Sequence, residues 1–296
     1  MKQLTIVECP FNLGLKELTP GVAPGVDKLP AWLRQHGLYD RLGVTDIHTL
    51  AAPSYAMDLD PASGIRNADA IAAYAMEQAI LLRQLMKAGT FPLVIGGDCS
   101  ILIGNMLGLK QEGRYGLFFL DGHTDYMPAT LSSTHAAAGM DLALVTGYGH
   151  AKLTNIQQCT PYVQEAHTWA VGNRWQEPAY VAEIYRSSIH YLDLPALRKQ
   201  GMESCAAAFL EMIAHQPLDG FWIHVDVDVL HNDIMPAVDS PQDDGLSYAE
   251  LEALLIPLLR HPQAAGIEVT ILDPDRDPMG KYTRPFVDSL VRVLVH

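Results

Sequence analysis

The sequence predicts a three-layer αβα fold of the α/β class, with helices on both faces of a mainly parallel central sheet. Eight short strand-like runs alternate along the 296-residue chain with longer helical patterns. Strands joined by helices lie parallel, and such a sheet is covered on both faces. No internal repeat, low-complexity tract or glycine-serine linker divides the chain. We therefore expect a single domain over residues 1–296.

The expected strands are short and mostly apolar, which is typical of a sheet buried on both faces. They span residues 4–7, 46–50, 92–95, 116–120, 168–171, 189–192, 220–225 and 266–272. Two of the helices between them carry clear end signals. Residues 65–87 are rich in alanine and are followed by the stop signal Gly89. Residues 248–259 follow Ser247, which forms a capping box with Glu250.

Two clusters of potential metal ligands each follow an apolar run. Residues 121–125 read Asp-Gly-His-Thr-Asp, and residues 226–228 read Asp-Val-Asp. In an open α/β sheet, ligands bind outside the carboxyl ends of the strands, where loops from neighbouring strands converge. The two clusters, about a hundred residues apart in the sequence, can therefore meet in the fold.

Four carboxylates and one imidazole at one place indicate bound cations, because a buried unpaired charge costs several kcal/mol. One divalent ion would leave excess negative charge. Two ions about 3.5 to 4 Å apart, bridged by carboxylates, would balance it and supply an activated hydroxide. Oxygen ligands with one nitrogen favour Mn²⁺, with Zn²⁺, Fe²⁺, Co²⁺ or Ni²⁺ as alternatives. Each residue taken singly would be an ordinary turn or cap residue, so the combination carries the prediction.

Three motifs, in their order and spacing, resemble the metal motifs of the ureohydrolases, the arginase and agmatinase superfamily. They are residues 96–100 (Gly-Gly-Asp-Cys-Ser), residues 121–125, and residues 226–230 (Asp-Val-Asp-Val-Leu). Residues 21–38 are also similar to the loop before the first helix of that family, so the resemblance covers most of the chain. It implies an arginase-like fold, hydrolysis of a C–N bond, and a homo-oligomer, commonly a trimer or hexamer.

The resemblance also implies a role for six side chains as ligands of two metal ions. A more exposed ion would take Cys99 and Asp125, a second ion would take His123 and Asp228, and both would share Asp121 and Asp226. Most family members have histidine where this chain has Cys99. A thiolate is softer than imidazole and more negative, so it could weaken Mn²⁺ binding, favour Zn²⁺ or Fe²⁺, or leave the position empty. The alternative interpretation of Cys99 is a small buried hydrophobe.

Two further departures from the family concern the substrate and the proton. Ile271 stands where arginases and agmatinases have a glutamate that accepts hydrogen bonds from the guanidinium, and isoleucine offers no acceptor. Four acids are candidate substitutes: Glu268, Asp273, Asp275 and Asp277, with Glu268 alternatively a support for the metal ligands. Ala138 replaces the proton-shuttling histidine of the family. His135 is the nearest candidate for that catalytic role, and a solvated loop histidine is the alternative.

Such a site would support metal-assisted hydrolysis. A hydroxide that bridges the two ions would attack an sp² carbon, and Asp125 would relay the proton to the leaving amine. Residues 129–137 lack the arginase pattern that grips an α-amino acid, so we expect a guanidino or amidino substrate other than arginine. A hydrolase of a formimino compound or acylated amine is one alternative, and a catalytically weak partner of an active homologue is another. Arg174 either lies near the pocket mouth or pairs with surface acids.

Composition agrees with a soluble enzyme that acts on a small molecule. The net charge of −14 disfavours nucleic acid and anionic membranes as partners. No run of about 18 apolar residues marks a membrane span, and the first residues lack the apolar core of a secretory signal. The four cysteines have no paired spacing, so neither a disulfide framework nor a zinc finger is indicated. We expect a cytoplasmic location.

Overall fold

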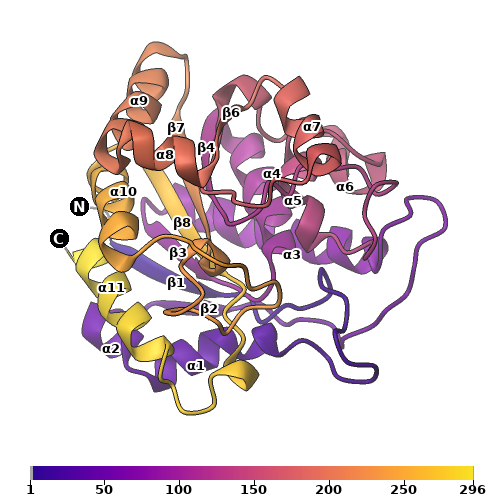
Figure 1. Cartoon of the computed structure of the whole chain (residues 1–296), viewed down its shortest axis with the longest axis horizontal. Helices are drawn as coiled ribbons and strands as arrows, with labels where there is room; N and C mark the ends of the chain where they lie inside the picture. Colours follow the sequence, from indigo (N-terminus) through magenta and orange to yellow (C-terminus); the bar gives the residue numbers. More distant parts are fainter. Residues whose placement is uncertain (1–2, 296) are drawn as a thin grey trace.

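One eight-stranded sheet forms the centre of the structure, a computed structural model that describes residues 3–295 (Figure 1). The strand order is β2-β1-β3-β8-β7-β4-β5-β6, and every neighbouring pair is parallel. The strands are β1 (Leu4–Glu8), β2 (Ile47–Thr49), β3 (Phe91–Ile95), β4 (Tyr115–Leu120), β5 (Thr168–Val171), β6 (His190–Leu192), β7 (Gly220–Asp226) and β8 (Ala264–Thr270). All of the expected strands are present, so the predicted parallel sheet is confirmed.

Helices lie between the strands as the alternation predicts. They are α1 (Leu29–Gln35), α2 (Leu38–Leu42), α3 (Ala68–Lys87), α4 (Leu102–Glu112), α5 (Asp141–Val145), α6 (Ala151–Thr154), α7 (Pro178–Arg186), α8 (Leu194–Gln200), α9 (Met202–His215), α10 (Tyr248–Arg260) and α11 (Thr283–Val295). The capping box of Ser247 and Glu250 at the start of α10 is confirmed. Within residues 3–295, no helix has the length and apolar character needed to cross a bilayer.

Two hydrophobic cores fill the space between the sheet and its helices. Helices α1, α2 and α8–α11 pack on one face, and α3–α7 pack on the other (Figure 1). Successive strand residues point to opposite faces, so Phe118 belongs to the first core and Phe119 to the second. The three-layer αβα arrangement is therefore confirmed.

The strand order brings the metal motifs together at one edge of the sheet. Strands β3, β8, β7 and β4 are consecutive neighbours, and each is followed by one of the loops of interest. Leu120 pairs with Val225, and Asp226 pairs with Thr270, so β4, β7 and β8 end side by side. Because the strands are parallel, their carboxyl ends share this edge. The residues that follow them converge there.

Strand β8 ends earlier and helix α3 begins later than the sequence predicts, and in both cases a neighbouring residue with positive φ sets the boundary. Strand β8 stops at Thr270 because Ile271 adopts a left-handed conformation with φ 77° and donates its N–H to the carbonyl of Gly97 at 2.8 Å. Such a conformation is a genuine outlier for a β-branched residue. Helix α3 begins at Ala68 because Asn67 has φ 55°. Ile271 is therefore held in a strained conformation at the edge where the metal motifs meet.

Candidate metal centre

Two groups of potential ligands share Asp121 at the carboxyl end of β4. One consists of Asp121, His123 and Asp228, and the other of Cys99, Asp121 and His224, with the ligand atoms of each group within 4.8 Å of one another. A carboxylate common to two such groups is suited to bridge two cations. The geometry thus fits two adjacent ions that share Asp121.

The first group is built by the loops after β4 and β7. His123 Nδ1 lies 2.8 Å from Asp228 Oδ2 and 3.7 Å from Asp121 Oδ1. The amide of Gly122 donates to Asp228 Oδ1 at 3.0 Å. Arg174 donates through Nη2 to the backbone carbonyl of Asp228 at 2.6 Å. These contacts fix Asp228 and leave one of its oxygens facing the imidazole of His123.

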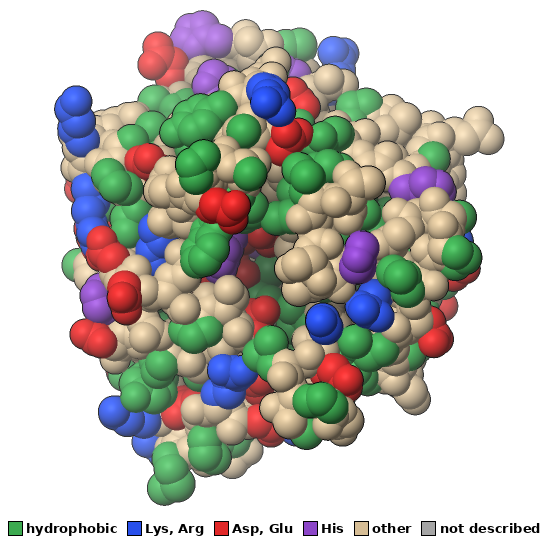
Figure 2. Space-filling view, turned by 45° about the vertical axis from the view of Figure 1, so that its right-hand side comes forward, with side chains coloured by type: hydrophobic (Ala, Val, Ile, Leu, Met, Phe, Trp, Pro, Cys, Tyr) green, Lys and Arg blue, Asp and Glu red, His purple; other side chains and the backbone are tan. Residues whose placement is uncertain are grey.

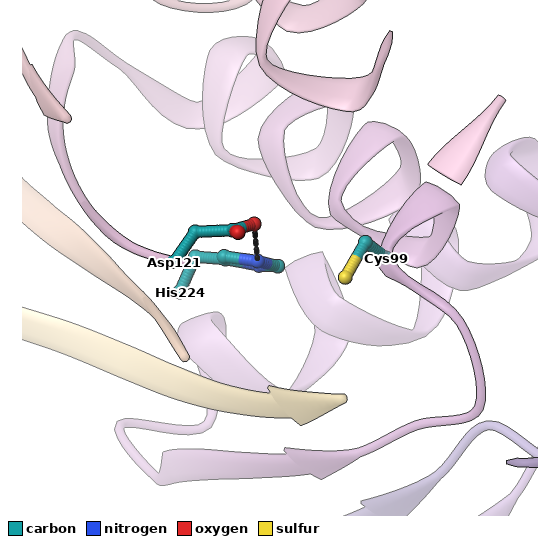
Figure 3. A group of neighbouring side chains, drawn as sticks. All are labelled: Cys99, Asp121 and His224. Carbon is teal, nitrogen blue, oxygen red and sulfur yellow. Dashed lines mark ion pairs between the residues drawn. The ribbon is translucent and has the colours of Figure 1, made fainter. Parts of the chain in front are cut away.

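The second group lies deeper, between the ends of β3, β4 and β7 (Figure 3). Cys99 opens a short 3₁₀ turn (Cys99–Ile101) after β3, and its Sγ lies 3.0 Å from Asp226 Oδ2 and 3.0 Å from Thr270 Oγ1. His224 Nε2 lies 4.0 Å from Asp121 Oδ2. Cys99, Asp121 and His224 are all buried. Cys99 was predicted to hold the more exposed ion; here its group is fully buried, whereas the first group contains the partly exposed His123.

Further carboxylates surround these groups. Asp226 Oδ1 accepts from the amide of Asp228 at 2.7 Å. Asp125, with φ 41°, turns its backbone beside the hydroxyl of Tyr180, which donates to Asp125 Oδ1 at 3.4 Å. Asp141 is fully buried at the start of α5. Its Oδ2 and the Oδ2 of Asp121 have no hydrogen-bond partner in the described structure.

Burial and mutual repulsion disturb the ionisation of these acids. Burial is the main cause that raises the pKa of Asp121, Asp125, Asp141 and Asp226, and each also lies near at least one other acid that raises it further. For Asp228, burial raises the pKa, but the charge of His123 and its hydrogen bond lower it more. Buried acceptors without donors are rare in proteins. Divalent cations among these oxygens would satisfy the orphaned atoms, so the residues present fit a two-metal site.

Metal-free protein should lose stability as the pH rises from about 4 to about 6. Burial raises the pKa of Asp98 and of Asp239 from 3.8 to about 6. The folded state then keeps protons that the unfolded chain has already released, so the free energy of unfolding falls with rising pH. The shift of Asp98 alone corresponds to about 3 kcal/mol. Thermal unfolding in a chelator across this range measures the effect, and a metal-free protein that is more stable at neutral pH than near pH ~4.5 would contradict it.

The six side chains predicted as ligands all lie in or beside the two groups, at the ends of β3, β4 and β7. Their role as ligands stays a prediction.

His135 contacts residues outside the two ligand groups. Its Nδ1 is 2.9 Å from the carbonyl of Gly64, and its own carbonyl accepts from Arg66 at 2.8 Å. His135 thus belongs to a loop–loop contact, and its catalytic role also stays a prediction.

All four acids proposed to replace the family glutamate have other partners. Glu268 is fully buried and accepts from Asn105 and, at 2.8 Å, from His224 Nδ1, so it supports the site from behind. Asp277 accepts from the amide and hydroxyl of Thr283 at 2.8 and 2.6 Å. Asp275 pairs with Lys28 at 2.6 Å. The contacts of Glu268 fit its stated alternative role as a support for the metal ligands. Asp277 and Asp275 are bound to residues outside the two ligand groups.

The acid Asp273 is also bound to backbone. It accepts from the amide of Asp275 at 2.9 Å and from that of Gly25 at 3.3 Å.

Arg174 does not pair with surface acids. Its Nε and Nη1 are buried without partners in the described structure, beside Gly122 at the first ligand group. Arg174 thus lies beside the first ligand group, as the first of the two interpretations held, and not among surface acids.

Four residues of the site were not predicted: His224, Asp141, Tyr180 and Asp239. A signal existed for His224, because it precedes Asp226 by two residues and side chains two apart in a strand share a face. Asp239 lies in the loop between β7 and α10, where no pattern marks it. Figure 2 shows a hollow in the molecular surface in which acidic and histidine side chains are visible. The side chain of His123 is 16% exposed, so the first ligand group reaches solvent.

Known proteins resemble this chain in sequence and structure. The profile of the Arginase family matches residues 2–296. An arginase of Brevibacillus brevis is 30% identical over 259 residues, which cover 84% of this chain and 83% of the relative. The native arginase structure from Bacillus caldovelox at pH 5.6 matches with a TM-score of 0.88 at 26% identity, covering 100% of this chain and 99% of that one. The formimidoylglutamase of Bacillus subtilis shares the fold, with a TM-score of 0.74 at 18% identity, covering 100% and 87%. The chain is therefore a member of the arginase family, a family of metal-dependent hydrolases that act on C–N bonds.

Proposed function

We propose that this chain is a single-domain binuclear metallohydrolase that cleaves a C–N bond of a guanidino or amidino compound other than arginine. The observation that carries the proposal is the pair of ligand groups that share Asp121 among buried, partly unpaired carboxylates. The ions would be held by Cys99, Asp121, His123, Asp125, Asp226 and Asp228. When bound, divalent ions such as Mn²⁺ would polarise the substrate and make a water acidic enough to attack at neutral pH.

Asp125 is placed to take up and return a proton. Its carboxylate accepts a hydrogen bond from the hydroxyl of Tyr180 at 3.4 Å. The oxygen of the same hydroxyl accepts hydrogen bonds from the backbone amides of Thr124 and Asp125 at 2.8 and 3.1 Å. Tyr180 thus fixes both the backbone and the side chain of Asp125. Burial first, and the charge of Asp121 second, raise the pKa of Asp125. A carboxylate with a raised pKa is a better general base and acid near neutral pH than an ordinary one.

Asp239 supplies the acceptor that Ile271 cannot. Ile271 is buried and apolar at the position of the family glutamate. Asp239 lies near enough to Asp228 and His123 for both charges to alter its pKa, which burial raises to about 6. The next residue, Ser240, reaches His123 Nε2 at 3.3 Å. The loop that carries Asp239 therefore faces the first ligand group, and an ionised carboxylate there suits a planar cation with several N–H donors.

Residues 129–137 support a substrate without an α-amino acid end. Two of their polar side chains, Ser132 and Thr134, are used within the loop. Ser132 Oγ accepts from the amide of His135 at 3.0 Å and lies 3.2 Å from Thr134 Oγ1. The segment contains no Asn, Asp or Arg with which to grip a carboxylate and an amine. This supports a substrate that lacks those groups.

Asp239→Asn should raise KM for a cationic substrate about 10- to 100-fold while changing kcat much less, because a hydrogen bond to a charged group contributes about 1.5 to 3 kcal/mol. Steady-state kinetics on the best guanidino compound measures this split. Asp233→Asn is the matched control, since Asp233 lies on the same loop and its side chain is 87% exposed. Equal effects of the two substitutions would remove Asp239 from the substrate site.

Product release from a substrate panel tests the function itself. Urea should form from a guanidino compound that lacks an α-amino acid end, and arginine should be the poorer substrate. Turnover of a formimino compound or an acylated amine without urea release would instead support the alternative substrate class. Arginine as the best substrate would overturn the proposed specificity. A protein loaded with two metals and inactive on the whole panel would point to a structural or regulatory partner of an active homologue.

A further inference from the structure

A chain of buried polar side chains crosses the α3–α4 side of the sheet and ends at the second ligand group. Gln78 of α3 donates to Asn105 Oδ1 of α4 at 2.7 Å. Asn105 donates to one oxygen of Glu268, and the other oxygen lies 2.8 Å from Nδ1 of His224. All four residues are at most 1% exposed. Each link is a hydrogen bond between different elements, so the network fixes the position of the imidazole of His224.

The last atom of this network has no partner. His224 Nε2 is buried and unpaired in the described structure, and so is the atom it faces, Asp121 Oδ2, at 4.0 Å (Figure 3). Glu268 engages Nδ1 of His224 at 2.8 Å with one oxygen and Asn105 with the other, so Nε2 is the ring nitrogen left free for a ligand. A cation between Nε2 and Asp121 Oδ2 would give both buried atoms a partner.

We propose that His224 is a metal ligand and that Cys99, Asp121 and His224 form a zinc-preferring position of the binuclear centre. The proposal deepens the proposed function and rests on it for the presence of metal. Zinc binds imidazole nitrogen at about 2.0 to 2.1 Å and carboxylate oxygen at about 2.0 to 2.2 Å, so one tetrahedral ion would draw Nε2 and Oδ2 together from 4.0 Å to about 3.4 Å. Three protein ligands with a fourth position open is the arrangement of catalytic zinc sites.

The surroundings of His224 are those of a metal-binding histidine. Such a histidine donates its other ring nitrogen to a carboxylate, which fixes the ring and its tautomer, and here Glu268 provides that carboxylate. Phe119, the cross-strand neighbour on β4, stacks on the ring with centroids 4.5 Å apart and planes at 6°. The ring can therefore neither rotate nor flip without breaking both contacts. Its Nε2 is directed at the end of β4 before any ion arrives.

The assignment also accounts for Cys99. The family places an imidazole at that position, and this chain provides one from β7 instead. A thiolate, an imidazole and a carboxylate together favour Zn²⁺ over Mn²⁺. The first group keeps two carboxylates and His123, which suit Mn²⁺. We thus expect the two positions to differ in metal preference, with zinc at the deeper one.

His224→Asn tests the assignment, because the asparagine amide can still donate to Glu268 but has no atom at the position of Nε2. We expect zinc affinity, measured by competition with a chromophoric chelator, to fall at least about 100-fold, beyond the 10- to 100-fold typical of losing an outer partner. Cobalt bound in place of zinc should keep its thiolate charge-transfer band but change its visible bands. Cys99→Ser should abolish the charge-transfer band. His190→Asn is the matched control, since His190 of β6 stacks on Trp169 of β5 and belongs to neither ligand group.

One measurement on the wild-type protein keeps the proposal testable if His224→Asn fails to fold. X-ray absorption with one equivalent of zinc should show one sulfur and one imidazole ligand. Absence of either ligand, or a His224→Asn protein with wild-type zinc affinity and an unchanged cobalt spectrum, overturns the proposal and leaves His224 as an ion-pair partner of Asp121. None of these readings needs turnover. A protein that binds zinc through His224 but acts on no substrate would contradict the proposed function alone.

Discussion

Asp121→Asn should prevent binding at both metal positions and lower kcat/KM at least about 1,000-fold, because it removes the one carboxylate common to the two ligand groups. Loss of a partner behind a ligand costs about 10- to 100-fold, and loss of a shared ligand should exceed that. The amide has the shape of the carboxylate, so packing is preserved. Elemental analysis after reconstitution and the kinetics of product release are the two measurements.

The same substitution should change stability in opposite directions with and without metal. Burial raises the pKa of Asp121, which means that the site disfavours its charged form when no cation is present. We therefore expect metal-free Asp121→Asn protein to unfold at the same temperature as metal-free wild type or at a higher one. With metal added, only the wild type should gain stability. A variant that is unstable in the chelator would show that Asp121 is needed for folding, and its lost activity would then say nothing about metal.

Gly97→Ala should be among the most destabilising single changes in the loop before Cys99, with a loss above about 3 kcal/mol. A Cβ on Gly97 would overlap the carbonyl oxygen of Phe11 and lie 2.6 Å from its carbonyl carbon. The obstacle is backbone, so no rotamer change relieves it. Gly97 also accepts from the amide of Ile271 at 2.8 Å, and the amide of Asp98 donates to Phe11 at 2.9 Å. Movement of Gly97 would therefore displace the loop that carries Cys99.

Gly139→Ala is the control for this prediction. No atom lies within 4 Å of a Cβ built on Gly139, and its φ of −80° is open to any residue. Its free energy of unfolding should stay within about 0.5 kcal/mol of wild type. Thermal unfolding of both variants in a chelator gives the comparison without the contribution of metal. Similar midpoints for the two variants would show that the loop accommodates the added methyl group.

The arrangement of the sheet was predictable because it depends on local patterns. Apolar runs such as residues 116–120 and 220–225 mark buried strands, and helices between them impose a parallel order. The capping box of Ser247 and Glu250 gave the start of α10 for the same reason. The end of β8 was not predictable, because Ile271 departs from its ordinary conformation only in contact with Gly97. A contact between distant loops leaves no mark in either local sequence.

The candidate site divides in the same way. Asp121, His123 and Asp228 were found because they follow buried strands whose carboxyl ends must share an edge. His224 and Glu268 were not recognised as a pair, although both lie inside strands, because their contact requires β8 to lie beside β7. The residues next to Glu268 in the sequence do not indicate whether its side chain faces an imidazole or the substrate.

The sequence by itself determined the alternating strands and helices, the parallel sheet and the strand ends that carry six candidate ligands, since periodicity and strand termini are properties of short segments. The tertiary structure alone decided which side chains of neighbouring strands meet. It placed Cys99 at the deeper position, directed His224 at Asp121 and brought Asp239 near His123. These relations depend on the order of strands in the sheet and on loop conformations, so only the folded chain expresses them.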